Sequence, residues 1–127
     1  MNAPSISVIL IDHNPILLNG IAALIRSQAD MQLVGMGRTA RDAVALHLQY
    51  DPDFTVIDLD LRDDRATYAI RQILSVDPAA KLIGLTTCEL DSAGPEARAA
   101  GVLGVVAKDR LEEDLVPLIR AHTTGKY

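Results

Sequence analysis

Five short apolar runs, each followed by an amphipathic stretch, constrain the fold of this chain more than any other feature. The runs are apolar on both faces, which is typical of parallel strands buried between two layers of helices. They span residues 6–11, 32–36, 54–59, 81–86 and 102–107. Regular alternation of strand and helix predicts an α/β fold with a doubly wound, five-stranded parallel sheet.

The stretches between the runs carry apolar residues at helical spacing. They predict helices over residues 16–27, 40–49, 64–76, 95–100 and 111–122. Asn14, Thr39 and Asp109 are placed to cap the first, second and fifth helices, and Gly101 can end the fourth. Pro117 falls inside the fifth helix, where it predicts a kink or a delayed start.

Size and composition limit the classes of protein that this chain can belong to. With 127 residues, about half of them apolar, it suits one domain spanning residues 1–127, with a polar stretch at 123–127 that can begin a linker. Its net charge is −5 and it has no basic run. We therefore expect this domain alone to bind neither nucleic acid nor a membrane surface.

The same composition bears on the cellular compartment. Cys88 is the single cysteine, so the chain forms no internal disulfide, as is common in a reducing environment. No apolar run reaches the length of a membrane span, and the first residues lack the pattern of a signal peptide. The sequence therefore predicts a cytoplasmic protein.

Polar residues end several of the apolar runs, and ligands of such folds bind at the carboxyl ends of the strands. Asp12 and His13 follow the first run, Asp58 ends the third, Thr86 ends the fourth and Lys108 follows the fifth. Asp12 and Asp58 could hold a hard cation through their oxygens. The hydroxyl of Thr86 and the ammonium of Lys108 could bind the oxygens of a phosphoryl group on Asp58.

At these positions the chain resembles the receiver domains of two-component response regulators. The matching segments are LIDHNPILLNGI at 10–21, PDFTVIDLDL at 52–61, LIGLTT at 82–87 and ARAAGVLGVVAKD at 97–109. The last segment is most similar to the branch whose members carry a LuxR-type helix-turn-helix output. The resemblance covers nearly the whole chain and implies a flavodoxin-like sheet of strand order 2-1-3-4-5.

The resemblance also implies roles for individual residues. Asp58 would accept a phosphoryl group from a histidine kinase, Thr86 would contact the phosphate and Lys108 would pair with it. Magnesium would be held by Asp12, Asp58 and the backbone carbonyl of Asp60. Such a domain is a switch that regulates an attached or partner transcriptional output, and it is not an enzyme in the ordinary sense. A homodimer through the fourth and fifth helices, or through the first and fifth, would also fit the family.

Three departures from the family pattern concern the metal and the switch. His13 stands where the family usually has a second acidic residue, and Val105 replaces the usual aromatic residue three positions before the lysine. The loop after the acceptor reads Leu61-Arg62-Asp63-Asp64, with Ala66 in place of a glycine. Imidazole is a poor ligand for magnesium, so we expect weak magnesium binding. His13 itself could ligate a softer metal such as zinc or nickel, fill the site without a metal, or point outward.

Two functions therefore remain open from the sequence. The first is a switch controlled by phosphorylation of Asp58, and the second is a degenerate receiver that acts as an interaction or dimerisation module without phosphate. A flavodoxin-like domain that binds a small ligand is a weaker third reading, because no glycine-rich phosphate loop is present. We expect His47 and His122 to lie at the surface or at its boundary, and Cys88 to be a packing residue.

Overall fold

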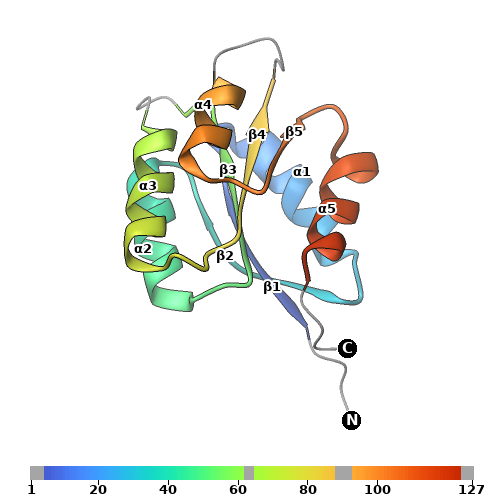
Figure 1. Ribbon diagram of the computed structural model, residues 1–127. Helices are drawn as coiled ribbons and strands as arrows, with labels where there is room; N and C mark the ends of the chain where they lie inside the picture. Colours follow the sequence, from blue (N-terminus) through green and yellow to red (C-terminus); the bar gives the residue numbers. More distant parts are fainter. Residues whose placement is uncertain (1–4, 62–64, 88–92, 124–127) are drawn as a thin grey trace.

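A single parallel sheet organises the chain, as Figure 1 shows. The computed structural model describes residues 5–61, 65–87 and 93–123. The strands are β1 (Ile6–Ile11), β2 (Met31–Gly37), β3 (Phe54–Asp58), β4 (Leu82–Thr86) and β5 (Gly104–Ala107). They lie in the order β2-β1-β3-β4-β5, and every pairing is parallel. The predicted fold class and strand order are confirmed.

Helices cover both faces of this sheet. They are α1 (Pro15–Arg26), α2 (Ala40–Tyr50), α3 (Ala66–Val76), α4 (Ala93–Ala100) and α5 (Val116–Ala121), the last preceded by a π-helical turn, η1 (Leu111–Leu115). In Figure 1, α1 and α5 lie on one side of the sheet, and α2, α3 and α4 lie on the other. None of the helices among the described residues is long and apolar enough to cross a membrane.

The core has two halves, one on each side of the sheet. Val8 and Leu10 of β1 pack toward α1 and α5, whereas Ile9 and Ile11 of the same strand pack toward α2 and α3. This division follows from the strand geometry, in which successive side chains point to opposite faces. Because both faces are covered, the central strands are apolar at nearly every position, as the sequence pattern indicated.

Local hydrogen bonds explain where the helices begin and end. The side chain of Asn14 accepts from the N–H groups of Ile16 and Leu17, and Thr39 forms a capping box with Asp42. Both predicted caps are confirmed. Gly101 closes α4 with φ +117°, a conformation that costs a residue with a Cβ more than it costs glycine.

The start of the last helix differs from the prediction. Arg110, not Asp109, is the N-cap residue of η1, and no side-chain hydrogen bond caps it. The chain makes one wide turn first and becomes α-helical only at Val116, immediately before Pro117. Proline is tolerated in the first turn because its missing N–H has no partner there. The predicted delay at Pro117 is thus confirmed, and the predicted cap at Asp109 is wrong.

His47 was expected at the surface, but its side chain is only 2% exposed. It lies on the inner stripe of α2 with Ala40 and Ala43. Its two ring nitrogens lie 3.0 Å from the hydroxyl of Thr55 and 3.0 Å from a carboxylate oxygen of Asp77. Polar contacts with these two residues offset the cost of burying an imidazole. The sequence did not reveal the contacts, because both partners lie on other elements of the fold. His122 is half-buried, as predicted.

Candidate functional site

The carboxyl edge of the sheet gathers the polar residues that the sequence placed at its strand ends. Asp58 is the last residue of β3, and Asp12 directly follows β1, its neighbour in the sheet. Both are buried, with exposures of 0% and 1%. Their placement at one edge follows from the parallel pairing of Ile11 with Ile57, one residue before each of them. The prediction that they share one end of the sheet is confirmed.

Lys108 reaches this edge from β5, on the far side of β4. Its backbone N–H donates to the carbonyl of Thr86 over 2.9 Å, which fixes the start of the side chain. Its Nζ lies 2.8 Å from Asp58 Oδ1 and 3.1 Å from Asp12 Oδ2, and the side chain is only 6% exposed. One ammonium therefore holds two buried carboxylates that would otherwise repel each other.

His13 closes the other side of the Asp58 carboxylate. Its Nδ1 lies 2.6 Å from Asp58 Oδ2, and its backbone N–H donates weakly to the same oxygen over 3.4 Å. The ring thus fills the site and does not turn outward, with 27% of its side chain exposed. Arg38, in the loop before α2, donates to the carbonyl of His13 over 3.1 Å and steadies this loop. Because a carboxylate is an acceptor only, Nδ1 carries the proton in this contact.

The loop after Asp58 is tied to its neighbours by Asp60. Its N–H donates to Asp58 Oδ1 over 2.8 Å, and its Oδ2 accepts from the N–H and hydroxyl of Thr87, each over 3.1 Å. Asp60 is partly buried, and its side chain links the end of β3 to the end of β4. Thr87 was not predicted to take part, although its position beside Thr86 at a strand end was the available signal. Asp63, Asp64 and Cys88 lie outside the described residues.

Burial and neighbours shift the pKa values of the two central groups in opposite directions. Burial raises the pKa of Asp58, but hydrogen bonds from Lys108, the Asp60 N–H and His13 outweigh it, so the net shift is downward. Burial lowers the pKa of Lys108, but Asp58 and Asp12 outweigh it and raise the value overall. Both shifts favour the charged forms, so the pair is ionised at neutral pH.

This shift predicts a dependence of stability on pH. A carboxyl whose pKa is lower in the folded state stabilises the fold above its unfolded value of 3.8, and this contribution is lost as the pH falls through the lower folded value. We expect wild type to lose more unfolding free energy between pH 5 and pH 3 than Asp58→Asn does, in chelator-treated buffer. Urea denaturation of both proteins across that range tests this. Parallel curves would show that Asp58 does not carry the effect.

The groups at this edge of the sheet can be compared with the ligands that a divalent cation requires. Asp12 Oδ2 is buried and, among the residues that the structure describes, accepts no well-directed hydrogen bond, although Lys108 is near it. Asp12, His13 and Asp58 also bring one ligand atom each to within 4.8 Å of one another. The two carboxylates therefore fit a divalent cation, whereas the imidazole could ligate it only after Nδ1 gives up its proton, and it offers nitrogen where magnesium prefers oxygen.

Another group with ligand atoms at similar spacing consists of His47, Asp51 and Asp77. Here both nitrogens of His47 already have partners in Thr55 and Asp77. These contacts account for the burial of the imidazole, and Asp51 is exposed at the end of α2. His47, Thr55 and Asp77 therefore form a polar link between α2, β3 and the end of α3.

Comparison with known proteins identifies the family of this chain. Residues 8–120 match the model of the response regulator receiver domain. The chain belongs to this family. It is 32% identical over 126 residues to the uncharacterized transcriptional regulatory protein YxjL of Bacillus subtilis, and 31% identical over 121 residues to the transcriptional regulatory protein DesR of the same organism. These alignments cover 99% and 95% of this chain but only 58% and 60% of the relatives.

Solved structures agree with this assignment. A LuxR-family two-component response regulator from Aurantimonas sp. SI85-9A1 superposes with a TM-score of 0.85 at 29% identity, covering 92% of this chain and 84% of that one. The response regulator domain of Thermotoga maritima CheB has the same fold, with a TM-score of 0.84 at 20% identity and coverage of 92% and 95%. The predicted receiver family and its likeness to the LuxR branch are confirmed. Receiver domains are not a classical enzyme family.

Proposed function

We propose that this receiver is a phosphorylation switch in which Asp58 accepts a phosphoryl group from the phosphohistidine of a histidine kinase. The observation that carries the proposal is the position of Asp58, buried at the end of β3 with Lys108 Nζ 2.8 Å from one of its oxygens. An ammonium keeps the buried carboxylate ionised, so that it can act as a nucleophile. The same ammonium can then pair with the negative charge of the phosphoryl group as it is transferred.

The two oxygens of Asp58 are not equivalent. Oδ1 is held by Lys108 and by the N–H of Asp60, both over 2.8 Å. Oδ2 is held mainly by His13, whose side chain is the more exposed of the two side-chain partners. We infer that His13 swings away and that Oδ2 attacks the phosphorus. The Oδ2–P bond forms while the P–N bond to the kinase histidine breaks, and the imidazole keeps the electron pair of that bond.

Residues of this chain would then hold the product. Lys108 Nζ would contact the new phosphoryl oxygens, and the Thr86 hydroxyl would donate to them. Asp12, Asp58 and the Asp60 carbonyl would hold magnesium weakly, which when bound neutralises charge on the phosphoryl oxygens. Val105 has no ring to flip, so we propose that the loop containing Thr87 carries the signal outward through its bonds to Asp60.

Partners of the receiver are part of the proposal. The chain spans about three-fifths of the length of the curated relatives it matches, and their names describe transcriptional regulators. We propose a histidine kinase as phosphodonor, a LuxR-type DNA-binding output in the same or a partner chain, and a cytoplasmic location. We also predict a homodimer through α4 and α5, or through α1 and α5. Sedimentation over a wide range of protein concentration tests this prediction.

Mass spectrometry after treatment with acetyl phosphate and magnesium tests the acceptor. We expect wild type to gain one phosphoryl group and Asp58→Asn to gain none, because the amide nitrogen and oxygen are far weaker nucleophiles than a carboxylate. Asp60→Asn is the matched control, since it removes a nearby carboxylate that makes no bond to Lys108, and it should still be modified. If wild type gains no phosphoryl group, and no adduct that hydroxylamine removes is found, the result would favour a module that works without phosphate.

A further inference from the structure

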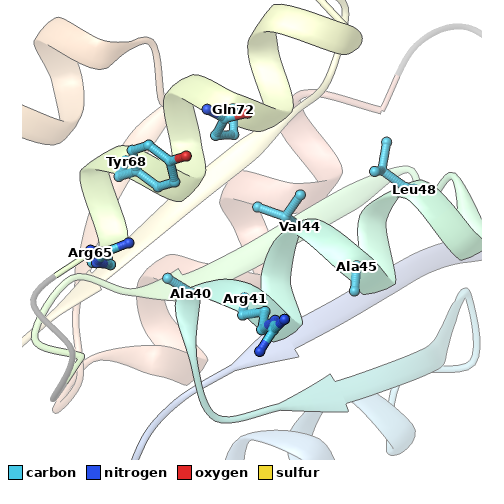
Figure 2. A pocket seen from close by; sticks show the side chains of 8 residues that line it. All are labelled: Ala40, Arg41, Val44, Ala45, Leu48, Arg65, Tyr68 and Gln72. Carbon is cyan, nitrogen blue, oxygen red and sulfur yellow. The ribbon is translucent and has the colours of Figure 1, made fainter.

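The outer surface between α2 and α3 carries a groove that the acceptor site does not use. It has a volume of about 680 Å³ and lies on the side of these helices that faces away from the sheet. Figure 2 shows Val44 and Leu48 of α2 along one wall and the ring of Tyr68 of α3 along the other. Leu48 and Tyr68 are 58% and 54% exposed, so large apolar side chains meet solvent here.

Positive charge gathers at one end of this groove. Arg41 lies in the first turn of α2 and Arg65 is the N-cap residue of α3, and Figure 2 shows both at the same end. Both are exposed, and neither forms an ion pair with any residue of 5–61, 65–87 or 93–123. By contrast, Arg110 and Arg120 are paired with acidic residues.

Two further features of α3 make this end attractive to an anion. The N-terminus of α3 lies there and contributes partial positive charge, whereas the N-terminus of α2 is already capped by Thr39 and Asp42. Arg65 also provides no side-chain hydrogen bond to cap α3. Its guanidinium lies 5.7 Å from the centroid of the Tyr68 ring, which restrains it near the groove and lowers the entropy lost on binding.

We propose that this groove docks an amphipathic helix of a partner protein that carries acidic residues at one end. Apolar side chains spaced by three or four residues would lie along Val44, Leu48 and Tyr68, and the carboxylates would reach Arg41 and Arg65. Charge selects this occupant: the chain as a whole carries −5, so an acidic helix is repelled over most of the surface and attracted here. Two aligned helices of 11 residues offer a groove about three turns long.

The position of the groove links it to the switch. Its arginine end lies at the N-termini of α2 and α3, beside the carboxyl edge of the sheet where Asp58 lies. A partner docked there would contact the face opposite to α1 and α5, and leave those helices free. This inference does not depend on phosphorylation of Asp58, and either can fail without the other.

A pair of synthetic peptides tests the proposal. Both have 14 residues, with leucines at positions that form one helical face; one carries three glutamates at one end and the other carries three lysines in their place. We measure binding to the 127-residue protein by fluorescence anisotropy and map it by amide chemical-shift changes. The glutamate peptide should bind at least tenfold more tightly, with the largest changes in α2 and α3, and added salt should reduce the difference.

Matched variants locate the site. Arg65→Ala and Leu48→Asp should each weaken binding of the glutamate peptide at least fivefold. Arg71→Ala and Val76→Asp change exposed residues of α3 that do not line the groove, and they should leave binding unchanged. Equal affinity for the two peptides, shifts centred on α1 or α5, or equal effects of groove and control variants would overturn the proposal. Binding to vesicles with anionic phospholipid but not to the glutamate peptide would also overturn it, in favour of a membrane surface.

Discussion

Replacing His13 by aspartate is expected to raise both the affinity for magnesium and the rate at which Asp58 takes up phosphate. The substitution puts a third carboxylate beside Asp12 and Asp58 and removes the imidazole whose Nδ1 lies 2.6 Å from Asp58 Oδ2. One more negative charge about 4 Å from the doubly charged cation contributes up to ~8 kcal/mol at an effective dielectric near 20, before the cost of desolvating the carboxylate. A net gain of roughly tenfold to a hundredfold in affinity is expected once that cost is subtracted.

The competing explanation is that the imidazole simply blocks the site. His13→Asn separates the two, because it removes the bond to Asp58 without adding charge. If charge dominates, the asparagine variant stays close to wild type in magnesium affinity while the aspartate variant rises. If blocking dominates, both variants rise together. Magnesium titration followed by calorimetry measures the affinity, and phosphoryl uptake is measured in parallel.

One result would contradict the charge argument outright. If wild type binds magnesium as tightly as His13→Asp, another group must supply the missing carboxylate, and Asp63 and Asp64 are the candidates in sequence. His47→Gln serves as a control in every titration, because it removes a second histidine that lies near two carboxylates. Its magnesium affinity should equal that of wild type.

Removing the ammonium of Lys108 is expected to destabilise the protein by about 3–5 kcal/mol. Lys108 is 6% exposed and lies between two carboxylates that are themselves buried. Without it, Asp12 and Asp58 are left in a poorly solvated site without their cation, and one of them must take up a proton or repel the other. Lys108→Met keeps most of the apolar stem and isolates the loss of charge. Urea denaturation at pH 7 in chelator-treated buffer measures the effect.

A second substitution checks the cause of that loss. Asp58→Asn removes one of the two negative charges, so Lys108→Met should cost much less in its presence than it does in wild type. The coupling between the two substitutions should amount to about 2 kcal/mol or more, because the groups are in direct contact. Equal losses in both backgrounds would show that Lys108 stabilises through packing of its stem and not through its charge.

Much of this receiver was predictable from local patterns in the chain. The five apolar runs located the strands to within one or two residues, because strands buried on both faces leave a continuous apolar signature. Asn14 and Thr39 were readable as caps, since their bonds reach only two or three residues along the chain. Asp58 and Lys108 could be placed at one site because the carboxyl ends of parallel strands meet at the same edge.

Tertiary structure alone decided the features that depend on distant partners. The sequence left His13 with three roles open, and the fold placed its ring against Asp58 from a neighbouring strand end. His47 looked like a surface residue, and only contacts with Thr55 and Asp77 account for its burial. The groove likewise needs α2 and α3 side by side. Short-range periodicity reports which face of an element is buried, whereas which residues meet across the fold depends on how those elements pack.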